Sequence, residues 1–143
     1  MPGITVGVDG SDRSLRALEW AVREAGLRGA ALTVLAVHQV AGNHWTGNPE
    51  VYPSDQPLTE AVRKAAEDAV QKVASQVGDP APASITVRAV TGLPAQELVE
   101  SSSDSDLVVV GSRGGGGFAK LLLGSVTAQV VNHAACPVVV IPG

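Results

Sequence analysis

The sequence predicts an α/β protein with one open, five-stranded parallel sheet, helices on both faces and the element order βαβαβαβαβ. Short runs of β-branched and aliphatic residues alternate with segments whose apolar residues recur at helical spacing. A helix between successive strands favours parallel pairing with right-handed crossovers. With 143 residues, the chain is expected to form a single domain over residues 1–143.

The chain begins with a predicted strand, helix and second strand. Ile4–Val8 is short, β-branched and apolar, and Asp9-Gly10-Ser11 ends it. Apolar residues at helical spacing predict a helix over about 12–27, with Ser11 or Asp12 as its N-cap. Ala31–Val37 is apolar almost throughout, as expected of a parallel strand that is buried on both faces.

The middle of the chain contains a long polar segment, two helices and a strand. Residues 43–57 are rich in glycine and proline and too long for a simple connection, which is typical of a lid or of disorder. Leu58–Val77 has the pattern of an amphipathic helix. Ser84–Val90 alternates and predicts a strand at a sheet edge, and Pro94 suits the first turn of a helix that ends at Ser102.

The last third of the chain predicts two strands around one helix. Leu107–Val110 is a buried strand, and Val138–Ile141 is an apolar strand at a sheet edge, which favours pairing with another chain. The low content of charged residues, 17%, also indicates self-association. The helix between these strands is expected to bury one stripe of residues, namely Thr127, Val130, Val131 and Ala134.

The segment from Gly111 to Ser125 predicts an anion site. Five glycines lie within residues 111–117, directly after a buried strand, and a helix begins near Ser125. Glycines let main-chain amides approach a ligand, and a helix N-terminus offers unpaired amides to phosphate. Residues 107–143 contain no Asp or Glu, so Arg113 and Lys120 are uncompensated there, although the chain carries a net charge of -4. A merely flexible connection is the alternative interpretation.

Several other classes of protein are disfavoured. The acidic balance argues against nucleic-acid binding, and no signal peptide or membrane span is evident, so we expect a cytoplasmic protein.

The single Cys136 is expected to be a small buried residue. A P-loop would need Gly-Lys-Ser/Thr, but Ala119 precedes Lys120, and residues 6–11 lack a dinucleotide fingerprint.

The glycine spacing Gly111-x2-Gly114-x9-Gly124-Ser125 resembles the signature G-2x-G-9x-G-[S/T] of the ATP-binding branch of the universal stress protein family. The resemblance extends over the whole chain, from Asp9-Gly10-Ser11 after the first strand to the closing Cys136-Pro137-Val138. It implies a Rossmann-like fold of the adenine nucleotide alpha hydrolase type. It also implies a homodimer formed by pairing of Val138–Ile141.

The resemblance further implies a site for ATP, with Mg²⁺ or Mn²⁺ bound alongside it. Asp9 would reach the ribose or a metal on the phosphates, and the backbone of Val37 would meet the adenine edge. Asp9 and Ser125 are alternatively plain helix-capping residues, which for Ser125 is compatible with a binding role. The residues expected to bind the nucleotide are Asp9, Gly10, Ser11, Val37, Gly111, Ser112, Arg113, Gly114, Gly124, Ser125 and Val126.

The expected function is that of a nucleotide-dependent regulatory protein in the stress response, with slow ATP hydrolysis at most. Fast phosphoryl transfer needs a placed base, a metal clamp and charge stabilisation at the γ-phosphate. Only Asp9 and the loop amides offer parts of that set. The alternative is a nucleotide-independent interaction protein that acts through its dimer surface. An adenylate-transferring enzyme would need a second substrate pocket, for which the short chain leaves little material.

Overall fold

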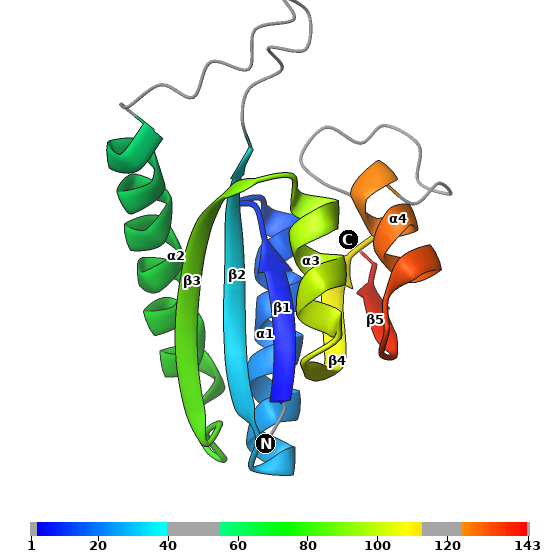
Figure 1. Ribbon diagram of the computed structural model, residues 1–143. Helices are drawn as coiled ribbons and strands as arrows, with labels where there is room; N and C mark the ends of the chain where they lie inside the picture. The colour runs from blue at the N-terminus through cyan, green and yellow to red at the C-terminus, as the bar shows by residue number, and fades with distance from the viewer. Residues whose placement is uncertain (1–2, 40–54, 113–123, 143) are drawn as a thin grey trace, which may run out of the picture.

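The computed structural model describes residues 3–39, 55–112 and 124–142 and has the predicted architecture (Figure 1). Five parallel strands form one sheet in the order β3-β2-β1-β4-β5. The predicted edge positions of the third and fifth strands are therefore confirmed. Most of the 43–57 segment, together with Arg113 and Gly114, lies outside the described residues.

The element bounds agree with the sequence pattern to within a few residues. The second helix starts three residues earlier than expected, at Asp55, because Pro57 is tolerated in a first turn, where its missing amide has no helical partner. The fourth strand starts two residues earlier, at Ser105. The elements are β1 (Gly3–Val8), α1 (Asp12–Arg28), β2 (Ala31–Gln39), α2 (Asp55–Val77), β3 (Ser84–Gly92), α3 (Pro94–Ser102), β4 (Ser105–Gly111), α4 (Ser125–His133) and β5 (Val138–Ile141).

The sheet separates two apolar layers. Helices α1 and α2 cover one face, and α3 and α4 cover the other (Figure 1). Because successive strand residues point to opposite faces, Val109 packs under α1 while its neighbours Val108 and Val110 pack under α3 and α4. The low aromatic content, 3%, is matched by a core of Ile, Leu, Val and Ala side chains.

Strand β1 lies at the centre of the sheet, where the direction of winding reverses. The chain winds outward from β1 through β2 to β3, then crosses back to β4 and ends at β5. Loops leaving β1 and β4 therefore diverge at the carboxyl ends of these strands, and such a switch point is where open parallel sheets bind ligands. Strand β2 extends beyond its last pair with β1, Val8 with Ala36, so Val37–Gln39 pair only with β3.

Two sequence expectations are wrong in detail. Val131 is 44% exposed instead of buried, because β5 is the last strand and no described element lies beyond it to cover α4. Cys136 is only partly buried, at the rim of the α3–α4 layer. Within the described ranges, no helix has the length and apolarity needed to cross a membrane.

Candidate functional site

A pocket of about 700 Å³ opens at the switch point, above the carboxyl ends of β1, β2 and β4. Residues far apart in the chain meet there. The ends of the three strands form its floor, α4 contributes its N-terminus, and α2 contributes one wall. Seven of the predicted site residues line the pocket, namely Asp9, Gly10, Val37, Gly111, Gly124, Ser125 and Val126.

The other predicted site residues fall into two groups. Ser11 and Ser112 do not line the pocket but hold residues that do. Ser11 donates to the Asp9 carboxylate, and the carbonyl oxygen of Ser112 accepts a 2.8 Å hydrogen bond from the amide of Gly124. Arg113 and Gly114 belong to the range 113–123, which the structure does not describe.

Asp9 follows β1 and is held in a capping turn. Its Oδ1 accepts from the amide of Ser11 at 2.9 Å and from the Ser11 hydroxyl, while its own amide donates to Ser14 Oγ at 3.2 Å. Partial burial alone would raise the pKa of Asp9, but the hydrogen bonds from Ser11 and Ser14 outweigh it and hold the pKa below 3.8. Asp9 is therefore an ionised carboxylate at neutral pH, at the mouth of the pocket.

Gly10 gives this turn its shape. Its φ of +84° lies in the left-handed region, which glycine adopts without the steric penalty of a Cβ. The turn lets Ser11 serve as N-cap of α1, because Ser11 Oγ accepts from the amide of Ser14 at 3.2 Å. Asp9 thus faces the pocket although α1 begins only three residues later.

The N-terminus of α4 opens toward the pocket without a side-chain cap. Gly124 is the N-cap residue, with φ -63° and ψ 158°, and it has no side chain that could accept from the first-turn amides. Unpaired amides and the helix dipole make such an end attractive to an anion. Gly124 does not adopt a left-handed conformation, so backbone freedom does not explain the glycine. Its effect is that no side chain at the N-cap competes with a ligand for the first-turn amides.

The two ends of the glycine segment are joined by hydrogen bonds. Thr127 Oγ1 donates to the carbonyl oxygen of Gly111 at 2.6 Å, and the Gly124 amide bonds Ser112 as described above. Ser112 in turn donates its amide to Ile141 at the end of β5, at 2.9 Å. These contacts fix the first turn of α4 above β4.

An apolar wall completes the pocket, and sequence reasoning did not assign it to the site. Val62, Ala65, Ala66 and Ala69 of α2 line it. Val62, Ala66 and Ala69 belong to the stripe that predicts burial against the sheet, and the pocket is lined by the same stripe. One sequence feature could have identified this wall as part of the site. Small side chains lie at the start of a helix that follows a long polar segment.

The interior of the pocket also contains residues that the glycine signature does not include. Ser14, His38 and Thr127 supply polar atoms, and Leu98 packs beneath the floor. A Cβ built on Gly7 would lie 3.0 Å from Leu98 Cδ1, so glycine at this position allows α3 to approach β1 closely. Within the described ranges, no three His, Cys, Asp or Glu side chains are grouped so that they could hold a metal ion.

Fold and site together define a class. An open parallel α/β domain with a pocket at its switch point, a carboxylate after the first strand and an uncapped helix N-terminus has the architecture of the doubly wound class, in which the switch point is the usual place of ligand sites. Sequence comparison then identifies the family. The chain belongs to the universal stress protein family, whose sequence profile matches residues 2–142.

Curated mycobacterial relatives resemble almost the whole chain. A universal stress protein of Mycolicibacterium smegmatis is 34% identical over 141 residues, which is 99% of this chain and 48% of the relative. Universal stress protein Rv2005c of Mycobacterium tuberculosis is 37% identical over 141 residues, covering 97% of this chain and 47% of the relative. The chain thus spans about half the length of these relatives.

Solved structures of the family share the fold. Universal stress protein UspA of Lactobacillus plantarum has a TM-score of 0.79 and 29% identity, covering 98% of this chain and 97% of that chain. A universal stress protein in complex with cAMP has a TM-score of 0.67 and 30% identity, covering 98% and 95%. One from Archaeoglobus fulgidus in complex with dAMP has a TM-score of 0.61 and 25% identity, covering 99% and 98%.

Proposed function

We propose that the protein is an ATP-binding universal stress protein that acts as a nucleotide-dependent regulator, with slow ATP hydrolysis at most. The observation that carries the proposal is the convergence of seven predicted site residues, from the ends of three strands and the start of α4, on one pocket. The cAMP and dAMP complexes of two similar structures support an adenine nucleotide as its ligand.

The adenine is proposed to lie at the β2 side of the pocket. The backbone of Val37 lies beyond the last residue of β1, so its side toward β1 has no strand partner and is open to the polar edge of a base. The apolar wall of α2, with Val62, Ala65 and Ala66, suits the flat face of the ring. The β2 backbone thus matches the polar edge of the adenine, and the α2 wall matches its apolar face.

The phosphates are proposed to lie at the β4 side. Gly111 ends β4, Gly124 is the N-cap of α4, and the amides of Ser125 and Val126 have no side-chain cap. Gly114 completes the signature in the sequence, and Ser112 and Arg113 lie between its first two glycines, where Arg113 supplies a positive charge. The Ser125 hydroxyl adds a further donor. Amides at a helix start bind phosphate through both hydrogen bonds and the helix dipole.

Asp9, with Gly10 and Ser11 shaping its turn, is the proposed ligand for Mg²⁺ or Mn²⁺ accompanying the nucleotide. Its lowered pKa keeps it charged, and Mg²⁺ is commonly held by one or two carboxylates together with substrate phosphates. Ser11 holds Oδ1 through its amide and its hydroxyl, which fixes the orientation of the carboxylate. The Asp9→Asn variant should lose affinity for ATP with Mg²⁺ but not for ATP in EDTA.

We also propose a homodimer formed through β5, in the cytoplasm, where ATP is abundant. Val138–Ile141 is an edge strand, and each of its residues keeps part of its surface exposed. Ser112 bonds directly to Ile141, so the end of the glycine segment and the proposed dimer edge are one hydrogen bond apart. This link supports a role in which nucleotide binding changes the dimer surface.

Calorimetry with ATP and Mg²⁺ tests the binding proposal. Ser125→Pro removes one amide donor and the hydroxyl at the first helical position, where proline fits and Gly124 already has a compatible conformation. Ser125→Ala keeps the amide and serves as the matched control. We expect binding by the wild type, a small loss in Ser125→Ala and a much larger loss in Ser125→Pro. A wild type that binds no adenine nucleotide would refute the proposal.

A further inference from the structure

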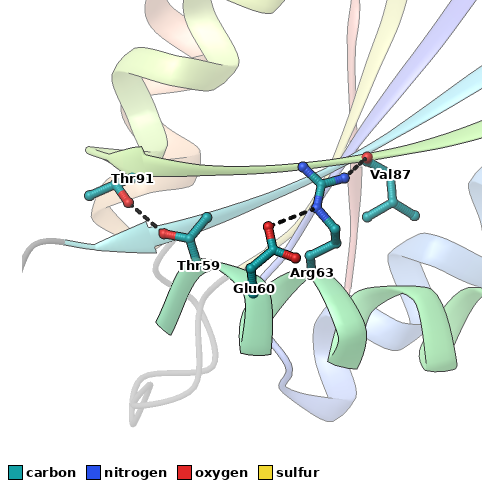
Figure 2. A network of polar contacts seen from close by, with 5 residues as sticks. All are labelled: Thr59, Glu60, Arg63, Val87 and Thr91. Carbon is teal, nitrogen blue, oxygen red and sulfur yellow. Dashed lines mark hydrogen bonds and ion pairs between the residues drawn. The ribbon is translucent and has the colours of Figure 1, made fainter. Parts of the chain in front are cut away.

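The N-terminal half of α2 is attached to the edge of the sheet by polar contacts (Figure 2). The hydroxyls of Thr59 and Thr91 are hydrogen-bonded at 2.8 Å, and Arg63 Nη1 donates to the carbonyl oxygen of Val87 at 3.0 Å. Glu60 Oε1 lies 3.8 Å from Arg63 Nε. Thr91 and Val87 belong to β3, so both hydrogen bonds join α2 to the same edge strand.

Burial contributes little to this part of the helix. The buried residues of α2 begin with Ala66 and continue with Val70 and Val73. From Thr59 to Ala65 every residue is exposed or half-buried. Because apolar burial anchors the later turns but not the first described ones, the position of the early turns depends on the contacts to Thr91 and Val87.

These early turns also carry the pocket wall. Val62, Ala65 and Ala66 line the pocket, and Thr59 and Arg63 occupy the adjacent stripe of the same helix, about 100° around the axis. A rotation or outward tilt of these turns would therefore move the wall away from the pocket. Figure 2 shows Arg63 reaching from α2 to the edge strand.

We propose that Arg63, assisted by Thr59, is a positioning residue for the nucleotide site: it holds the α2 wall at the distance required to pack on the base. This inference rests on the proposed adenine site. Neither residue lines the pocket, so both act through the wall. Arg63 is the stronger of the two, because a hydrogen bond from a charged donor exceeds one between hydroxyls. The contact with Glu60, whose side chain is 72% exposed, contributes little.

The test compares Arg63→Met with Lys64→Met. Both substitutions remove one positive charge and retain an aliphatic stem, but Lys64 has no hydrogen bond or ion pair recorded among the described residues. ATP affinity is measured by calorimetry well below the melting temperature, where a change in global stability does not alter it. We expect about a fivefold loss for Arg63→Met, a smaller loss for Thr59→Val and no change for Lys64→Met.

Two further measurements address the mechanism. In the unliganded protein, hydrogen exchange of the amides of residues 59–66 should be faster in Arg63→Met than in Lys64→Met. Arg63→Lys retains a donor and should recover part of the lost affinity.

Equal ATP affinity of Arg63→Met and Lys64→Met, with a wild type that binds ATP, would overturn the inference and leave the proposed function intact. Self-association of Arg63→Met without loss of affinity would overturn it too, since Arg63 would then only cover the β3 edge. If the wild type itself binds no ATP, both proposals fail.

Discussion

Thr127 Oγ1 donates a 2.6 Å hydrogen bond to the carbonyl oxygen of Gly111, which joins the first turn of α4 to the end of β4. Thr127 is buried, at 4% exposure, so this hydroxyl has little access to water. The bond spans the glycine segment between residues 111 and 127 and lies beside the proposed phosphate site. It is thus both a stabilising contact and a constraint on the direction of the α4 amides.

Replacing Thr127 by Val should weaken both stability and nucleotide binding. Valine keeps the shape but leaves the Gly111 carbonyl oxygen without this donor, which should lower the free energy of unfolding by about 1–3 kcal/mol. Urea denaturation measures this loss and calorimetry measures ATP affinity. Thr127→Ser retains the hydroxyl and should bind ATP nearly as well as the wild type. Identical affinities of all three proteins would contradict a role for the bond in the site.

Gly10→Ala should destabilise the protein through backbone conformation alone. No atom lies within 4 Å of a Cβ built at this position, but φ is +84°. A left-handed conformation costs a non-glycine residue about 1–2 kcal/mol, and asparagine tolerates it better than alanine. Chemical denaturation should rank the proteins as wild type, Gly10→Asn, then Gly10→Ala. If Gly10→Ala were as stable as the wild type, the turn would have to adopt another backbone conformation in the variant, and the predicted cost of the left-handed φ would be contradicted.

Asp9 should make stability depend on pH at the acidic end. Because the pKa of Asp9 in the folded protein lies below 3.8, its charged form stabilises the fold fully above that ordinary value. This contribution is lost as the pH falls through the lower pKa of the folded state. The difference in unfolding free energy between wild type and Asp9→Asn should be constant near neutral pH and shrink below about pH 4. A difference independent of pH would show that the carboxylate is not preferentially charged in the fold.

Val140→Pro should separate the proposed dimer without unfolding the protomer. The carbonyls of Pro137 and Ile141 accept from β4-side amides, so by alternation Val138 and Val140 direct their backbone groups to the outer edge. Proline is tolerated at an edge position whose amide faces solvent, but it blocks pairing with another strand. Sedimentation should give a dimer for the wild type and a monomer for the variant, with unchanged circular dichroism. A dimeric variant would exclude pairing along β5.

The sequence was a good guide to the fold because each element carries its own local signal. Ser11 and Gly29 mark the ends of α1 through capping chemistry, and the apolar run of Leu107–Val110 requires burial on both faces. Parallel pairing followed from the βα alternation, and the edge position of β3 from its alternating pattern, while the full strand order comes from the structure. Val131 was misplaced because a helical stripe does not reveal where the sheet beneath it ends.

The site was predicted less completely. For residues on turns and at helix starts, such as Asp9 and Gly124, the residue type and its spacing from the preceding strand are enough to predict a place in the site. The α2 wall could not be separated from the core stripe, because both use the same small apolar residues at the same period. The contact between Arg63 and Val87 depends on a side chain reaching across to another element, and no local pattern encodes that.

The two apolar layers that flank the sheet differ in the number of buried side chains that the described residues place in them. Among the described residues, thirteen buried side chains make up the cluster beneath α1 and α2, whereas only five make up the cluster beneath α3 and α4. The thinner half should open more readily in local fluctuations. It is also the half that contains the α4 amides and meets β5. A bound anion would therefore stabilise the α4 end of this layer, next to the C-terminal strand β5.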